Sequence, residues 1–445
     1  MFIAKCAIAT VCLPLLTSGQ TATDMKQVLE RLDRLEEQNR ALLEEIQSLR
    51  RQLAPTAAVA APAAPSPVEE RVAIVERRLD EQNQAKVESD NRLPLRLTGM
   101  ALFNAYLNGS YNGESQYPTT ASLAPGSNVG GGTLRQSIIG LLFQGPNIAG
   151  GGKVNGSIYF DAFAGTGTSL NQLLRLRVAT VDFAWKNTTF SVSQDKPIMA
   201  PREPNSLAQM GVSPLTGAGN LWLWSPQARV EQRFALGEQG GLKAQLGIFQ
   251  TSESGTGLAG ANAEYLSRAR PGYEGRFEFW RRFGQGGRIE IAPGFHVSDT
   301  HVNGQSAPSR IFTVDWLIRP VARVDFMGTF FNGENTGVVG GLRQGVQVDS
   351  KGVVHSVQSL GGFAQLTWRA TARLSFNVYG GMQDDRNRDL PAGGIGRNLT
   401  YAANVFYRVG SNVLASFEAS QVRTLYLGYG YRLNPHYDLA IAYLF

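Results

Sequence analysis

From Leu93 to Phe445 the sequence consists of segments about ten residues long in which polar and apolar residues alternate one by one. The segment "KVNGSIYFDA" (153–162) places Lys, Asn, Ser, Tyr and Asp on one face and Val, Gly, Ile, Phe and Ala on the other. A period of two is the period of a β-strand, since successive side chains point to opposite faces of a sheet. The chain contains 50 Gly, which fits a fold with many turns. The alternation therefore predicts a large all-β region.

We expect sixteen strands in this region, separated by connections whose lengths alternate. The predicted strands are roughly 93–108, 133–144, 153–162, 173–185, 188–195, 227–236, 241–251, 270–282, 287–298, 309–319, 321–331, 356–368, 371–381, 397–408, 411–423 and 432–445. The short connections are 185–187, 237–241, 283–287, 319–320, 369–371 and 409–411, and the long ones are 109–132, 194–226, 252–269, 299–308, 332–355 and 382–396. Strict alternation of short and long connections predicts an antiparallel up-and-down barrel with one short-turn rim and one long-loop rim. An even number of strands places both ends of the barrel at the short-turn rim.

The width of such a barrel decides which face looks outward. Sixteen strands enclose a space too wide to be filled by apolar side chains, so the polar face should line a wet lumen and the apolar face should meet lipid. After residue 22 no stretch of 18 consecutive apolar residues occurs, so any membrane-spanning part must be a closed barrel. Two packed β-sandwich domains are the alternative, but sandwiches do not require alternating loop lengths.

The last strand carries the same alternation to the final residue. In "NPHYDLAIAYLF" (434–445), Tyr437, Tyr443 and Phe445 share one face with Leu and Ile, and Asp438 lies on the other. We expect this segment to close the barrel by pairing with the first strand, which removes both exposed edges. The aromatic residues would then lie near the membrane interfaces.

The N-terminus reads as an export signal. Residues 1–22 contain a positive Lys5, an apolar core too short to span a bilayer, and small residues after it, which together predict a signal peptide; a buried N-terminal helix is the alternative. Cys6 and Cys12 both lie in this segment. The mature chain would therefore have no cysteine, which excludes disulfides and Cys-based metal sites.

Residues 23–53 predict an α-helical coiled coil. An uninterrupted heptad places Leu, Ile and Met at most a positions and Val or Leu at every d position, with Asn39 at one a position. A buried Asn at this position sets the register of a coiled coil and in parallel coils often favours two strands. An Ala/Pro linker follows at 54–67, and a weaker heptad at 68–92 predicts a short helical neck before the barrel of 93–445.

These features together resemble a known family. The signal peptide, the coiled coil, "LPLRLTGMALFNAYLNG" (93–109) at the start of the barrel and "YDLAIAYLF" (437–445) at its end are similar to trimeric outer-membrane porins of the DcaP-like kind. The resemblance implies a homotrimer in the bacterial outer membrane, a periplasmic coiled coil, and passive uptake of small, often anionic, solutes. It also implies that Tyr443 and Phe445 belong to the signal read by the barrel assembly machinery.

The loop 194–226 is the longest segment without a clear period, and in the porins that this chain resembles the third long loop folds into the lumen and narrows it. Its Asp195 and Lys196 and the pair Arg202–Glu203 would then meet arginines of the wall. Residues 93–445 carry 30 Lys/Arg against 22 Asp/Glu, net +8, whereas residues 24–92 carry 11 against 14, net −3. Clustered guanidinium groups bind carboxylates and phosphates, so we expect a preference for anions. The predicted pore-lining residues are Lys196, Arg202, Glu203, Arg175, Arg177, Arg229, Arg233 and Arg276.

Other functions are disfavoured by missing motifs. The chain has four His and neither G-x-S-x-G nor H-E-x-x-H, so we expect no enzyme, no cofactor and no metal site. A nucleic-acid partner does not fit an exported chain. The alternatives are a non-selective porin with balanced Arg–Glu pairs, a plugged envelope tether whose coil binds a periplasmic or cell-wall component, and a barrel hydrolase.

Overall fold

The computed structural model describes residues 95–164, 172–251, 255–256, 270–302, 304–342 and 344–445. The predicted signal peptide (1–22), coiled coil with Asn39 (23–53), linker (54–67) and neck (68–92) lie outside the described residues, so they stay predictions. All of the described residues belong to one compact unit, Ser89–Phe445.

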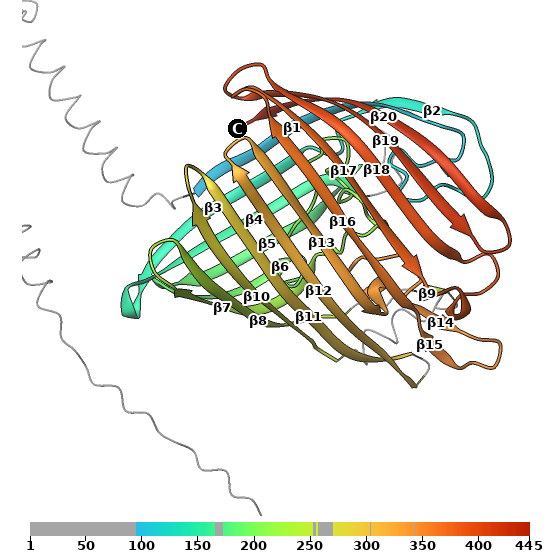
Figure 1. Ribbon diagram of the computed structural model, residues 1–445, viewed down its shortest axis with the longest axis horizontal. Helices are drawn as coiled ribbons and strands as arrows, with labels where there is room; N and C mark the ends of the chain where they lie inside the picture. Colours follow the sequence, from blue (N-terminus) through green and yellow to red (C-terminus); the bar gives the residue numbers. More distant parts are fainter. Residues whose placement is uncertain (1–94, 165–171, 252–254, 257–269, 303, 343) are drawn as a thin grey trace, which may run out of the picture. The chain divides into compact units, whose positions relative to one another are not determined.

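The unit is a closed antiparallel β-barrel (Figure 1). Its strands are β1 (Leu95–Asn108), β2 (Val129–Thr133), β3 (Ile138–Ile148), β4 (Gly152–Ala164), β5 (Leu173–Ala184), β6 (Thr188–Asp195), β7 (Ser225–Ala235), β8 (Gly240–Phe249), β10 (Gly272–Phe283), β11 (Gly287–Val302), β12 (Gln305–Val321), β13 (Val324–Glu334), β16 (Gln358–Arg369), β17 (Leu374–Asp385), β18 (Ile395–Arg408), β19 (Val413–Tyr426) and β20 (Gly430–Leu444). Because β2 and β3 pair with successive parts of β1, they form one interrupted barrel strand, and the barrel has sixteen strands as predicted. A small separate sheet consists of β9 (Gly255–Thr256), β14 (Val346–Val348) and β15 (Val354–Ser356).

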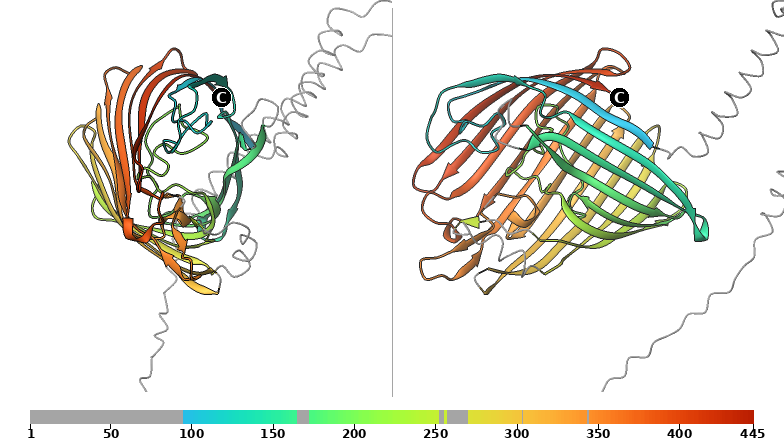
Figure 2. Two further views of the ribbon diagram at one scale, coloured as in Figure 1. Left: turned by 90° about the vertical axis from the view of Figure 1, so that its right-hand side faces the viewer. Right: turned by 180° about the vertical axis from the view of Figure 1, so that it is seen from behind.

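The last strand closes the barrel on the first. β20 pairs antiparallel with β1 over Met100–Asn108, and the backbone of Phe445 exchanges hydrogen bonds with Gly99 at 3.0 and 3.1 Å. In the left view of Figure 2 the strands form a closed ring around the segments inside the barrel. The terminal segment is therefore an integral barrel strand, and the sheet has no unpaired edge there.

The two faces of the wall have the expected chemistry. On β20, Leu439, Ile441 and Tyr443 are exposed on the outside, whereas Asp438 is buried on the inside. On β10, Phe277 and Phe279 are exposed, whereas Arg276 and Glu278, which alternate with them, are buried. The barrel therefore presents a continuous apolar exterior, as an outer-membrane barrel requires.

The inner face differs from the expectation of an entirely polar lumen. Inward-facing apolar residues are present on several strands, among them Leu102, Ile311, Phe331 and Phe363, all almost fully buried. They are covered by chain segments that lie inside the barrel. Apolar side chains interrupt the polar inner face at the places where a loop packs against the wall.

Several strand boundaries also differ from the prediction. The connection expected to be long at 299–308 spans only 303–304, because β11 and β12 extend well beyond the wall. In addition, β19 and β20 are connected by a turn at 427–429. The turn expected at 319–320 lies at 322–323. The chain continues through Pro320 as a strand because the β12–β13 register shifts there, which tolerates a residue without an N–H.

The interruption between β2 and β3 has a structural reason. A regular strand would turn adjacent side chains to opposite faces, yet Arg135 and Gln136 are both buried. The break allows both side chains to point inward. At the break, the backbone N–H of Leu102 on β1 donates a 2.9 Å hydrogen bond to the Ser137 hydroxyl instead of to a strand carbonyl.

Candidate functional site

The long connection between β6 and β7, residues 196–224, lies inside the barrel and is bound by strands all around the wall (Figure 2). We call it the inner loop; it is the central part of the loop predicted at 194–226. Asn404 donates to the Asn205 carbonyl at 2.8 Å, and the Ser206 hydroxyl donates to Glu418 at 2.7 Å. The wall residues that bind the inner loop through hydrogen bonds include Asn104, Gln136, Glu274, Thr313, Gln365, Asn398, Asn404 and Glu418.

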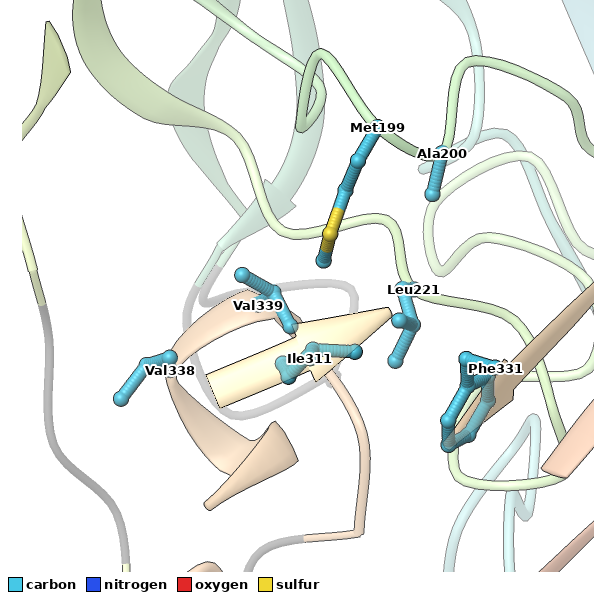
Figure 3. Close-up of a cluster of buried hydrophobic side chains, with 7 residues drawn as sticks. All are labelled: Met199, Ala200, Leu221, Ile311, Phe331, Val338 and Val339. Carbon is cyan, nitrogen blue, oxygen red and sulfur yellow. The ribbon is translucent and has the colours of Figure 1, made fainter. Parts of the chain in front are cut away.

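Apolar contacts reinforce these hydrogen bonds at three places on the wall. In one cluster, Met199 and Leu221 of the inner loop pack with Ile311 and Phe331 of the wall and with the 3₁₀ turn Thr336–Val339 (Figure 3). The other two clusters are Leu207 with Met100, Leu102, Ala440 and Ala442, and Leu215 and Ala218 with Phe363, Tyr379 and Ala402. Burial on three sides holds the inner loop as a packed part of the fold.

Glycines allow the closest approach between the inner loop and the wall. Gly217 and Gly219 have φ of 66° and 100°, as expected for the tight return of the loop. A Cβ on Gly219 would lie 2.1 Å from the carbonyl oxygen of Gly362 on β16, so a side chain cannot be accommodated there.

An ion-pair network joins the inner loop to β10, β11 and β12. Arg202 of the loop binds Asp315 and Glu290, both at 2.6 Å. Asp315 also binds Arg276 of the wall at 2.6 Å, and Arg276 reaches Glu278 at 2.7 Å. Two of the predicted arginines therefore share one buried carboxylate that the sequence pattern did not single out.

A second cluster lies on β4 and β5. Arg175 and Arg177 bind the buried Asp161 at 2.6 and 2.9 Å, and the two guanidinium groups also donate to the inner-loop carbonyls of Gly211 and Met210. The β4–β5 register shifts at this point, and such bulges re-aim side chains. The Trp224 ring lies against both, with its centroid 5.1 Å from the Arg175 guanidinium and 4.7 Å from that of Arg177. The N–H groups of the two guanidinium groups are thus held by oxygen acceptors, and the plane of each guanidinium group lies near the Trp224 ring.

Lys196 and Glu203 pair within the inner loop at 2.6 Å. Burial opposes the charge on Glu203, but Lys196 and a hydrogen bond from Ser213 outweigh it and hold the pKa of Glu203 below its ordinary value. This ion pair bridges two parts of the loop, so it rigidifies the loop itself.

The remaining predicted cations lie elsewhere. Arg229 binds Asp195 at 3.1 Å, at the base of the inner loop. Arg233 pairs with Glu231 near the short-turn rim and is 65% exposed, and the structure does not bring it to the inner loop.

Tyr443 and Phe445 lie on the outer face at the end of β20.

The cations and acids near the inner loop are nearly balanced. Arg175, Arg177 and Lys196 meet Asp161 and Glu203, which leaves 3 − 2 = +1. On the other side, Arg202, Arg276, Lys243 and Arg288 meet Asp315, Glu278 and Glu290, which leaves 4 − 3 = +1. Every predicted cation has an acidic partner. Each of these two clusters, counted without the acids Glu274 and Glu418 that also bind the inner loop, holds one cation more than it has acids.

Two further loops enter the barrel, and the sequence pattern did not predict either. In the loop between β1 and β2, Ala121 N–H donates to Thr424 at 2.8 Å; after β13, Leu342 N–H donates to Gln383 at 3.0 Å. A cavity of about 730 Å³ lies where these loops meet the inner loop. Residues lining it include Tyr117, Thr120, Phe163, Arg175, Trp222 and Gln344.

Within residues 95–445, gaps excepted, no group of three His, Cys, Asp or Glu side chains is placed to hold a metal ion. In the same described part of the chain, no helix is long and apolar enough to cross a membrane.

Comparisons with known proteins identify the fold. No family model matches the chain, and no curated protein matches it in sequence. The outer membrane channel DcaP of Acinetobacter baumannii superposes with a TM-score of 0.64 at 14% identity, covering 79% of this chain and 97% of that one. An anion-selective porin from Comamonas acidovorans superposes with a TM-score of 0.50 at 10% identity, covering 79% of this chain and 99% of that one. The described unit therefore has the barrel fold of these porins, as the resemblance in sequence implied.

Proposed function

We propose that this chain is an outer-membrane porin through which small hydrophilic solutes diffuse passively. The observation that carries the proposal is a closed sixteen-stranded barrel with an apolar exterior and largely polar inner walls. A barrel with these two surfaces is stable in lipid and leaves an aqueous interior. The names of the two superposed structures, a channel and a porin, support the same function, and neither name is that of an enzyme.

We further propose that the inner loop narrows the passage. Its hydrogen bonds and three apolar clusters attach it to opposite sides of the wall, so solutes must pass beside it. The cavity next to Arg175 would form the part of the path on the long-loop side. A narrowed path excludes large solutes and brings small ones close to the charged groups of the wall.

The charge balance supports a preference for anions such as carboxylates. The two ion-pair clusters each retain one positive charge, and Arg175 is partly exposed next to the cavity. In a narrow passage of low effective dielectric, a net charge of this size favours anions over cations. A non-selective porin is the competing proposal, since every predicted cation has an acidic partner.

A plugged tether is the second candidate function, and the three inward-folded loops favour it.

Swelling of proteoliposomes distinguishes an anion-preferring porin, a non-selective porin and a plugged tether. Vesicles carrying the protein and placed in small sugars or carboxylates should swell faster than empty vesicles, with carboxylates entering faster than neutral solutes of the same size. Equal rates for carboxylates and neutral solutes would support a non-selective porin. No swelling with any solute would support the tether.

The proposal extends to the parts outside the described residues. A signal peptide at 1–22 would export the chain, and the coiled coil at 23–53 would lie in the periplasm and assemble three barrels. Tyr443 and Phe445 would be read by the barrel assembly machinery. A cysteine in place of Asn39, treated with a three-armed maleimide, would join up to three chains, so the largest cross-linked product distinguishes a coil of two chains from a coil of three.

A further inference from the structure

The short-turn rim of the barrel carries exposed cations that pair with no acid. Lys186, Arg281, Arg323, Arg373 and Arg408 are all exposed, and none forms an ion pair within the described part of the chain. We call these five residues the basic rim. The exposed acid in the same turns is Glu238 of the β7–β8 turn. The basic rim therefore concentrates positive charge at one end of the barrel.

The long-loop rim carries both paired and unpaired cations. There the exposed Arg310 pairs with Glu334, Arg397 with Asp384, and Arg388 with Asp389. Within the described part of the chain, Arg270, Lys351 and Arg423 on this side are also exposed and form no ion pair, and at the short-turn rim Arg233 pairs with Glu231. The short-turn rim nevertheless carries more exposed cations without an ion pair than the long-loop rim does.

Each cation of the basic rim lies within three residues, in sequence, of an exposed aromatic residue. Lys186 follows Trp185, and Arg408 follows Tyr407. Arg281 lies two residues before Phe283, and Arg323 and Arg373 lie three residues before Phe326 and Phe376. Aromatic residues on a barrel exterior mark the membrane interface, so side chains at the turns beyond them reach the layer of lipid headgroups. Long cationic side chains extend toward that layer and keep their charge in water.

We infer that the basic rim binds the phosphate groups of anionic phospholipids in the leaflet next to Leu95 and Phe445, the two ends of the described barrel. Phosphate accepts hydrogen bonds from guanidinium and ammonium groups, and an anionic surface attracts each Lys or Arg near it. The rim spans turns from β5–β6 to β18–β19, so it contacts lipids around most of the barrel. An acidic cell-wall polymer is the other possible partner, but the adjoining aromatic residues place these cations at the bilayer surface. The inference rests on the proposed membrane location and goes beyond it.

The test is a lipid-binding measurement on the full chain. A variant with Gln at all five rim positions would be compared with the unchanged protein in vesicles of phosphatidylcholine with and without phosphatidylglycerol. Native mass spectrometry of protein released from these vesicles counts the retained phosphatidylglycerol. The unchanged protein should retain it in preference to phosphatidylcholine, with a loss of about fivefold in binding per neutralised residue. The preference should fade at high salt, as expected for exposed charges.

Two control variants separate charge from fold. Arg310→Gln removes an exposed cation from the other rim and should leave the lipid preference unchanged. A second rim variant with Lys at the four Arg positions keeps the charge and should retain most of the preference. The inference fails if the five-Gln variant, folded and conducting, retains as much phosphatidylglycerol as the unchanged protein. It also fails if only binding to isolated peptidoglycan is lost. If the unchanged protein conducts no current, that result counts against the proposed function and not against lipid binding.

Discussion

Arg202 Nε lies 2.6 Å from Asp315 Oδ1, although 113 residues separate the two in sequence. The contact joins the first part of the inner loop to β12 of the wall, and both side chains are largely buried. Asp315 simultaneously binds Arg276, so one carboxylate couples the loop to the wall. This ion pair explains how a long loop with four prolines is held across the lumen.

Breaking this contact should loosen the loop. Arg202→Ala leaves Asp315 and Glu290 with one cation fewer in a buried site, and loss of one partner of a buried pair costs about 3–5 kcal/mol. We expect a lower unfolding temperature and larger, noisier single-channel currents, because the loop moves away from its position across the lumen. Arg233→Ala, at an exposed pair near the short-turn rim, is the matched control and should change neither property. Equal currents in the unchanged protein and Arg202→Ala would contradict the proposed narrowing.

Apolar packing inside the barrel should matter as much as charge. Phe331 is fully buried against the inner loop, and replacement of a buried Phe by Ala costs about 3–5 kcal/mol. The neighbouring Phe330 is exposed on the outer face. Thermal unfolding in detergent should therefore show a large loss of stability for Phe331→Ala and a small one for Phe330→Ala. The reverse order would mean that the assignment of the two faces is wrong.

The Asp161 cluster predicts opposite changes in ion selectivity. Arg175→Gln removes a positive charge beside the cavity and should lower the anion-to-cation permeability ratio. Asp161→Asn removes the shared carboxylate and should raise that ratio. A change of about 1 kcal/mol in ion energy corresponds to about fivefold in the ratio. The reversal potential under a salt gradient gives the permeability ratio of each variant. A shift of this ratio in the same direction for the two variants would exclude an electrostatic role for the cluster.

The lowered pKa of Glu203 predicts a dependence on pH. Since the folded-state pKa lies below the ordinary value of 4.5, the ion pair with Lys196 stabilises the fold above that value. This stabilisation disappears as the pH falls through the folded-state pKa. Glu203→Gln should therefore unfold at a lower temperature than the unchanged protein at neutral pH, and the difference should vanish in strong acid. A difference that persists in strong acid would show that the charge of Glu203 is not its cause.

The barrel could be predicted from sequence because its signal is local and repeated. Alternation of period two marks each strand, and the final run to Phe445 marks the closure. The strand count was confirmed, although the long connection expected at 299–308 was wrong, since sequence alternation does not show where a hairpin extends beyond the wall.

Contacts inside the barrel could not be predicted in the same way. Asp161 and Asp315 bind arginines that contact or belong to the inner loop, yet nothing in the local sequence of these two acids distinguishes them from other lumen residues. Their roles depend on the inner loop folding back into the barrel, where Arg202 meets Asp315 across 113 residues of sequence. One signal was available for Gln136, because the alternation breaks at "LRQS" (134–137), where two consecutive polar residues turn inward.

Single-channel recording in a planar bilayer tests the central claim most directly. If the described unit is a water-filled barrel with a slight positive surplus, purified protein should insert and produce discrete conductance steps whose reversal potential under a salt gradient indicates anion preference. Closure in three steps would further support a homotrimer. Protein that remains folded in the bilayer without conducting any current would contradict the claim.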